Sequence, residues 1–286
     1  METAPDDTGH DVTPGGEFIR SFPVFPSMDE RPDGRNWLAV SGFTALIAVA
    51  TALLAIVGLG LPTVALGAVL AAVAVAGLTV AATEHLAAAW VEHRRYVWFS
   101  VGLFAVGGLL GAALLVAGVD LTELLLEMLE EEFAPPEDDP EGDLEIDLSA
   151  TFFVFQNTPP FLMAVFGVLT LGLATFLVMF VNGVIVGNVA LSTAGIAGID
   201  FVIVALLPHG IFELPALFVA AGVGFRLLHR LGQRAIGSRE AFVTREYLVR
   251  TGTLVVFGWF LLVVAAFVEA YLTPTLLEVL FAARLE

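Results

Sequence analysis

Long apolar runs separated by short polar stretches dominate the pattern of this chain. A helix rises about 1.5 Å per residue, so roughly 20 apolar residues cross the ~30 Å hydrocarbon core of a bilayer. The pattern therefore predicts an all-α fold, a polytopic transmembrane helical bundle. Five runs are long enough, the fourth opened by Pro159-Pro160 and the fifth closed by Thr273-Pro274: Trp37–Leu59, Pro62–Ala82, Val97–Val119, Phe161–Val181 and Thr251–Leu272.

A sixth apolar stretch, Val184–Leu228, is interrupted by Pro208, Gly210 and Pro215 and reads as either one broken span or two. Arginine placement favours two, because cytoplasmic loops carry the excess of basic residues. Two crossings put 11 of the 12 arginines on one side, with only Arg284 on the other. We expect seven crossings, or six plus a re-entrant pair, in the cell membrane. The N-terminus is then cytoplasmic and the C-terminus outside.

The polar segments divide the chain into three parts. Residues 1–35 form a polar N-terminal tail, 36–83 a transmembrane hairpin, and 84–286 a membrane core with an acidic outer loop at 120–158. Within that loop, Asp120–Asp147 holds 13 acidic residues and no basic one. Leucines recur at helical spacing in Leu121–Phe133, which predicts an amphipathic helix on the outer surface.

Composition narrows the function. Of the 286 residues 58% are hydrophobic and 15% charged, where a soluble domain is about 25% charged. The net charge of −18 argues against nucleic acid as a partner. The chain has no Cys, which excludes thiol catalysis and thiolate metal sites, and no Lys, which excludes a phosphate-binding loop that ends in Lys.

Ionisable residues inside spans are costly and therefore mark candidate sites. They are few: Asp200, His209, Glu213 and Glu269, with Asn182 and Asn188 as uncharged company. His209 and Glu213 are one helical turn apart and can share a face. A metal pair, a proton path and a hydrogen-bonded structural plug are all compatible with this spacing. We expect no metal and no cofactor, because a zinc site normally needs three or four protein ligands and the spans hold one histidine.

The seven-crossing topology brings distant residues to one depth. It places His209, Glu213 and Glu269 near the outer surface, so we predict one structural polar cluster there, with Asn157 at its edge. Two further expectations concern small and polar residues. Small-xxx-small spacings at Gly107/Gly111 and Gly183/Gly187 predict close helix packing. The run from Thr83 to Arg95, with His85 and His93, reads as a solvated helix of an inner loop.

One ten-residue run, Leu207–Ala216 (LPHGIFELPA), resembles the signature of the stage II sporulation protein M family of integral membrane proteins. Three more pieces agree in order: Asn157 before a span, Asn182-Gly183 with Gly187 at its end, and Glu269–Pro274 closing the last span. The resemblance covers Val97–Pro274, and the hairpin Trp37–Ala82 is an addition to the usual five-span form.

The resemblance implies a scaffold rather than an enzyme. Family members in spore formers are membrane scaffolds that recruit extracytoplasmic cell-wall enzymes. We therefore expect an integral membrane scaffold whose partners are the lipid bilayer and membrane or extracytoplasmic proteins, and a homodimer is compatible with the glycine spacings. The alternative is a transporter or channel subunit that uses a broken helix around Pro208–Pro215.

Overall fold

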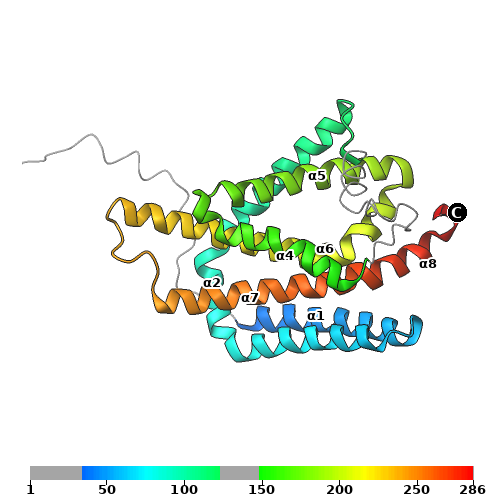
Figure 1. The fold of residues 1–286 in the computed structure, drawn as a ribbon, viewed down its shortest axis with the longest axis horizontal. Coiled ribbons are helices and arrows are strands. Elements are labelled where there is room, and N and C mark those ends of the chain that lie inside the picture. The colour runs from blue at the N-terminus through cyan, green and yellow to red at the C-terminus, as the bar shows by residue number, and fades with distance from the viewer. Residues whose placement is uncertain (1–33, 123–147, 286) are drawn as a thin grey trace, which may run out of the picture. The chain divides into compact units, whose positions relative to one another are not determined.

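The structure, a computed structural model, describes residues 34–122 and 148–285, which are helical and contain no strand. Six of their helices are long and apolar enough to cross a membrane, which confirms the all-α bundle. Figure 1 shows the helices α1 (Gly34–Leu53), α2 (Pro62–Val116), α4 (Ala150–Phe166), α5 (Leu173–Ala197), α6 (Ile199–Ala235), α7 (Arg245–Phe267) and α8 (Thr273–Leu285). Short turns of other helix types extend three of them: η1 (Leu54–Gly58), η2 (Gly167–Thr170) and η3 (Val268–Leu272).

The first two predicted spans form a hairpin as expected. Helix α1 with η1 packs along the first part of α2, and Pro62 occupies the first turn of α2 (Figure 1). Helix α2 has 55 residues, which is about 80 Å of helix and more than one bilayer needs. It is bent at Ala82, whose φ of −134° and ψ of 24° are not helical. The bend falls where the second predicted span ends. Because of its length, α2 can cross the membrane twice, once before the bend and once after it.

The fourth predicted span, Phe161–Val181, is wrong in its bounds. Helix α4 starts at Ala150, capped by the Ser149 side chain, and runs through Pro159 and Pro160 instead of starting there. The chain then reverses at Leu171 and Gly172, both in the left-handed region (φ 53° and 87°), and α5 begins. Hydropathy did not reveal this turn because both helices that flank it are apolar.

The interruption in the sixth apolar stretch is also placed differently. The chain reverses at Gly198 (φ 97°), and α6 continues from Ile199 through Pro208 and Pro215 to Ala235 without a break. The expected helix break at the prolines is therefore wrong. In the same way Pro274 does not end the last helix, since α8 continues from η3 to Leu285.

Glycines let α2 and α5 approach to backbone contact. A Cβ on Gly107 or Gly111 would overlap the carbonyl oxygen of Phe180 or Val184 on α5. A Cβ on Gly183 or Gly187 would overlap the carbonyl oxygen of Phe104 or Gly108 on α2. Both small-xxx-small pairs therefore meet in one internal seam, as such spacings do between membrane helices.

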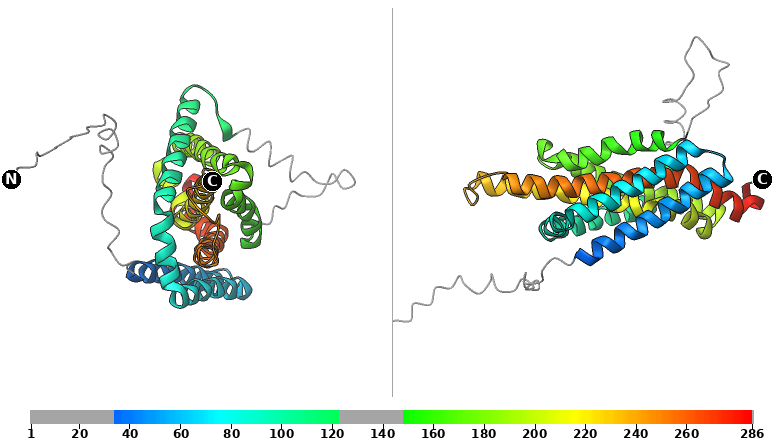
Figure 2. Two further views of the ribbon diagram at one scale, coloured as in Figure 1. Left: turned by 90° about the vertical axis from the view of Figure 1, so that its left-hand side faces the viewer. Right: turned by 90° about the horizontal axis from the view of Figure 1, so that it is seen from below.

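The helix bundle has two ends (Figures 1 and 2), and these ends differ in their charged residues. At one, the arginine end, α6 is joined to α7 across a stretch that holds Arg226, Arg230, Arg234, Arg239, Arg245 and Arg250. At the other, the acidic end, α2 finishes, α4 begins, and Arg284 of α8 pairs with Asp200 of α6.

The structure describes only the first two residues of the predicted helix Leu121–Phe133. These residues, Leu121 and Thr122, are helical, and the remainder lies outside the described residues.

The two ends generate a labelling prediction. Single cysteines at Ser238 and Ala283, both exposed, sit on a chain that has no other cysteine. We expect a membrane-impermeant maleimide to label Ala283→Cys in intact cells and Ser238→Cys only after lysis, because the cytoplasmic side of a membrane protein carries the excess of basic residues. Labelling of both positions in intact cells, or the reverse pattern, would overturn this orientation.

The seam generates a second prediction. Gly111→Ala should lower stability by about 2 kcal/mol or more, because the new methyl group forces α2 away from α5. Gly102→Ala is the matched control on α2, since nothing lies within 4 Å of its added Cβ. The control should be neutral or gain up to about 1 kcal/mol from helix propensity. Unfolding midpoints of both purified variants in detergent provide the measurement, and equal midpoints would contradict the seam.

Candidate functional site

Three ionisable side chains meet inside the bundle. His209 and Glu213 are four residues apart on the continuous helix α6, so they project from one face. Glu269 comes from η3, which packs against α6. A ring nitrogen of His209 and a carboxylate oxygen of each glutamate all lie within 4.8 Å of one another. We call these three residues the His–Glu cluster.

The cluster lies deeper than the sequence led us to expect. His209 follows the start of α6 by ten residues, which is about 15 Å along the helix axis. This is half of a ~30 Å hydrocarbon core. The prediction put His209 near the outer surface because it placed the chain reversal at Pro208–Pro215 rather than at Gly198. The residues still converge because α6 and η3 pack side by side.

The backbone around Glu269 departs from an α-helix. Residues Val268–Leu272 form a π-helical turn, closed by the bond from Thr273 N to Val268 O. Such turns insert one extra residue into a helix and are frequent at functional sites. Val268 is fully buried, so the turn is fixed in the core and sets the direction of its neighbour Glu269.

Polar atoms of the cluster lack local partners. Within the described part of the chain, His209 Nδ1 and Glu269 Oε2 are buried and make no hydrogen bond. Phe212, next to Glu213, is 2% exposed and belongs to the apolar core. Buried polar groups without partners are costly, so the cluster needs a compensating ligand, proton or water.

The other motif residues make contacts of their own. Asn157 is partly buried on α4, which packs against η3, and the neighbouring Thr158 accepts a hydrogen bond from Trp259 Nε1 at 3.1 Å. Asn182 donates to Val178 O within its own helix α5. Gly183 and Gly187 belong to the seam, and Gly210, Pro208 and Pro215 form part of α6.

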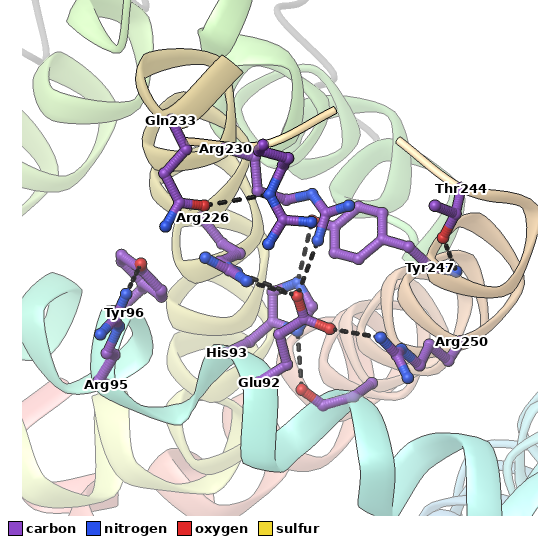
Figure 3. Close-up of polar contacts among 12 residues, drawn as sticks. Glu92, His93, Arg95, Tyr96, Arg226, Arg230, Gln233, Thr244, Tyr247 and Arg250 are labelled. Carbon is purple, nitrogen blue, oxygen red and sulfur yellow. Dashed lines mark hydrogen bonds and ion pairs between the residues drawn. The ribbon is translucent and has the colours of Figure 1, made fainter. Parts of the chain in front are cut away.

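A second polar cluster at the arginine end was missed by the sequence analysis (Figure 3). Glu92 of α2 accepts from Arg226 at 2.7 Å, from Arg230 at 3.1 Å and from Arg250 at 2.9 Å. These arginines come from α6 and α7, so one carboxylate joins three helices. The Glu92 side chain is 14% exposed and that of Arg230 is 3% exposed, so water screens these pairs only weakly.

His93 supports the same junction. Its Nδ1 donates to Ala89 O at 2.7 Å, because a carbonyl can only accept, and Nε2 then faces the Tyr247 hydroxyl at 3.4 Å. The Arg230 guanidinium lies 3.8 Å from the centre of the Tyr247 ring, in the geometry of a cation–π contact. The expectation that Thr83–Arg95 is a solvated helix is therefore wrong at Glu92 and His93, and holds for the exposed Glu84 and His85. The sequence from Thr83 to Arg95 alone does not indicate that Glu92 and His93 have partners on α6 and α7.

Comparison with models of known protein families identifies the family of this chain. The model of the stage II sporulation protein M family matches residues 100–274, more than half of the chain. The chain belongs to this family. With its six candidate spans it is a multi-pass membrane protein. The His–Glu cluster lies within the matched residues, whereas Glu92, α1 and the first part of α2 precede them.

Similarity to individual proteins is more distant. An uncharacterized protein of Methanocaldococcus jannaschii is 32% identical over 112 residues, which are 38% of this chain. The aligned part spans 61% of that relative's length. No solved structure matches the chain significantly.

The Glu92 junction generates the third prediction. Glu92→Gln removes the charge that compensates three arginines and should cost roughly 3 kcal/mol of stability, the typical loss when one partner of a buried ion pair is removed. Glu84→Gln, an exposed change on the same helix, is the matched control and should be neutral. Thermal unfolding of both in detergent tests this, and an unchanged midpoint for Glu92→Gln would show that the junction contributes little.

Proposed function

We propose that this stage II sporulation protein M family member is a scaffold that recruits or anchors partner proteins at the acidic end of its bundle. The observation that supports this proposal most is the charge of the segment Asp120–Asp147. This segment lies between α2 and α4 in the sequence and has 13 acidic residues and no basic one. An acidic segment attracts proteins with a basic surface and accelerates their association. The proposal makes the chain a binding protein rather than an enzyme.

Where the segment leaves α2, it is held by α5. The side chain of Asn188, fully buried on α5, donates to Gly111 O at 3.0 Å and to Val119 O at 2.8 Å, and accepts from Leu121 N at 2.8 Å. One side chain thus uses three hydrogen bonds to fix the last residues of α2 and the first of the segment. This support favours docking, because a partner that binds a fixed anchor point loses less entropy.

The first acidic residue of the segment is also tied down. Asp120 accepts from Thr122 N at 2.8 Å and from the Ser192 hydroxyl at 2.7 Å. These bonds, that from the backbone of Thr122 most of all, hold the pKa of Asp120 below its ordinary value, so the carboxylate stays charged. At the far end, Ser149 caps the N-terminus of α4.

Transport is the second candidate function, and the His–Glu cluster is the observation that favours it. Ionisable side chains inside a span commonly mark ion or proton pathways. The broken helix that first motivated this candidate is absent from the described residues, because α6 runs unbroken through Pro208 and Pro215. A discontinuous helix is the usual basis of such transport sites, which leaves recruitment better supported.

The scaffold proposal predicts a loss of partners when the segment is neutralised. One variant carries amides at eight positions of the segment: Glu123, Glu127, Glu130, Glu131, Glu132, Glu137, Asp138 and Asp139. The matched control carries amides at the eight acidic positions of the N-terminal tail: Glu2, Asp6, Asp7, Asp11, Glu17, Asp29, Glu30 and Asp33. Both are full-length tagged chains expressed in the native host, crosslinked in intact cells and compared by quantitative mass spectrometry.

We expect proteins crosslinked to the unaltered chain to fall about tenfold or more with the segment variant and to remain with the control, since the attraction is electrostatic. Moderate salt applied before crosslinking should weaken the same interactions. Equal recovery with both variants would exclude recruitment by the segment. Ion flux through proteoliposomes that is lost with Glu269→Gln would instead favour transport.

A further inference from the structure

We infer that His209, Glu213 and Glu269 form a binding site for one divalent transition-metal ion of the zinc class, deep within the bundle. The inference is independent of the recruitment proposal, because it concerns residues of α6 and η3 rather than the acidic segment. It also revises the expectation of no metal, which counted only the histidines in the spans and did not count the two glutamates of the predicted cluster as metal ligands.

The distances fit a site that closes around an ion. Zinc ligands lie at roughly 2.0–2.2 Å, so two ligands of a tetrahedral ion are about 3.4 Å apart. The candidate atoms all lie within 4.8 Å of one another, so shifts of about an ångström bring them to bonding distance. Rotations of the two glutamate side chains supply such shifts without moving α6 or η3, because a glutamate carboxylate pivots about three side-chain torsions.

Charge supplies a second, independent argument. Two carboxylates this close in an apolar core repel each other and need a cation or a shared proton. In the described part of the chain, the arginine ion pairs lie at the two ends of the bundle, on Glu92 and Glu246 and on Asp200. A divalent ion would neutralise both carboxylates. In the same cluster His209 Nδ1 and Glu269 Oε2 are buried without hydrogen bonds among the described residues, so polar atoms there lack partners.

The local backbone favours a built site over an accidental meeting of side chains. His209 and Glu213 share one face of α6 at the i, i+4 spacing that also pairs metal ligands on other helices. Glu269 reaches them from a π-helical turn whose extra residue changes the direction of the side chain relative to a regular helix. Without that turn, the residues after Val268 would be rotated by about 100° around the axis of the C-terminal helix.

The donor set selects the kind of metal. One imidazole nitrogen and two carboxylate oxygens suit Zn²⁺, Mn²⁺, Fe²⁺ or Co²⁺, whereas Ca²⁺ prefers six to eight oxygen ligands. Three protein ligands leave at least one coordination position open to water or another small ligand. The ion would also join α6 to η3 and thereby stabilise the middle of the bundle.

Co²⁺ is the probe for the test, because its visible absorption strengthens when the ion exchanges six water ligands for a site of lower coordination number in the protein. The full-length protein is purified in detergent, stripped with a chelator and titrated with Co²⁺, then with Zn²⁺. The unaltered chain should develop the absorption with a stoichiometry of one ion per chain, lose it when Zn²⁺ displaces Co²⁺, and unfold at a higher temperature with either ion.

Substitutions assign the signal to the cluster. His209→Asn and Glu269→Gln should each weaken Co²⁺ binding by about tenfold or more and abolish the thermal shift, since each removes a direct ligand. His85→Asn and Glu278→Gln are the matched controls, because both residues are exposed, on α2 and α8, and lie outside the cluster. Both variants should bind as the unaltered chain does. Size-exclusion profiles establish that each variant is folded.

Two results would overturn the inference. If the stripped, folded chain shows no visible absorption with Co²⁺ and no thermal shift with Co²⁺ or Zn²⁺, the cluster holds protons and no metal. If absorption appears but persists in His209→Asn and Glu269→Gln, the ion binds elsewhere. Should both variants fail to fold, X-ray absorption of the zinc-loaded unaltered chain decides. Scattering from one imidazole ring bound to the ion supports the site, and a spectrum without imidazole scattering contradicts it.

Discussion

The close approach of α2 and α5 is the constraint on which the bundle depends. In lipid there is no hydrophobic force between helices, so close packing and shared hydrogen bonds must hold them together. Four glycines, Gly107 and Gly111 facing Gly183 and Gly187, allow backbone contact that any larger residue would prevent. At one end of this seam lies Asn188, whose side chain satisfies the freed backbone groups at the end of α2. Helix packing and the anchoring of the acidic segment thus have one structural cause.

Polar side chains then connect the helices at three depths. Glu92 joins α2 to α6 and α7 at the arginine end, and the Asp200–Arg284 pair joins α6 to α8 at the acidic end. Between them the His–Glu cluster joins α6 to η3. Because unsatisfied polar groups are most costly in the apolar interior, these residues restrict how the helices can slide past one another. Their positions explain how a chain with so few charges holds a defined arrangement.

Some features of the sequence predicted the structure better than others: apolar runs located helices well, whereas prolines and glycines did not reveal where the chain reverses. Apolar runs with clear ends, such as Trp37–Leu59 and Pro62–Ala82, located α1 with η1 and the bend of α2 well. Prolines were misleading: Pro208 and Pro215 lie inside α6, because neighbouring groups in a packed bundle can satisfy the freed carbonyls. The real reversals are at Gly172 and Gly198, glycines with positive φ that hydropathy does not distinguish from the many others in the spans.

The same contrast applies to the polar sites. The convergence of His209, Glu213 and Glu269 followed from the i, i+4 spacing on α6 and from the antiparallel order of the spans, although their depth did not. The Glu92 junction had no comparable signal, because its arginines lie more than 130 residues away in sequence and each also fits a loop that faces the cytoplasm. A charge-based topology groups such arginines at one end of the bundle but does not predict that they turn inward.

The two buried clusters differ in one respect that matters for function. At Glu92 three guanidinium groups surround one carboxylate, so the protein itself supplies the positive charge that compensates the acidic group. In the His–Glu cluster two carboxylates face one imidazole, and the compensating charge must come from a bound proton or ion. A carboxylate whose cationic partners belong to the protein serves structure, whereas carboxylates that require a bound proton or ion couple the packing of α6 against η3 to the occupancy of the site. In the middle of the bundle, binding of a proton or an ion can therefore change the stability of the protein.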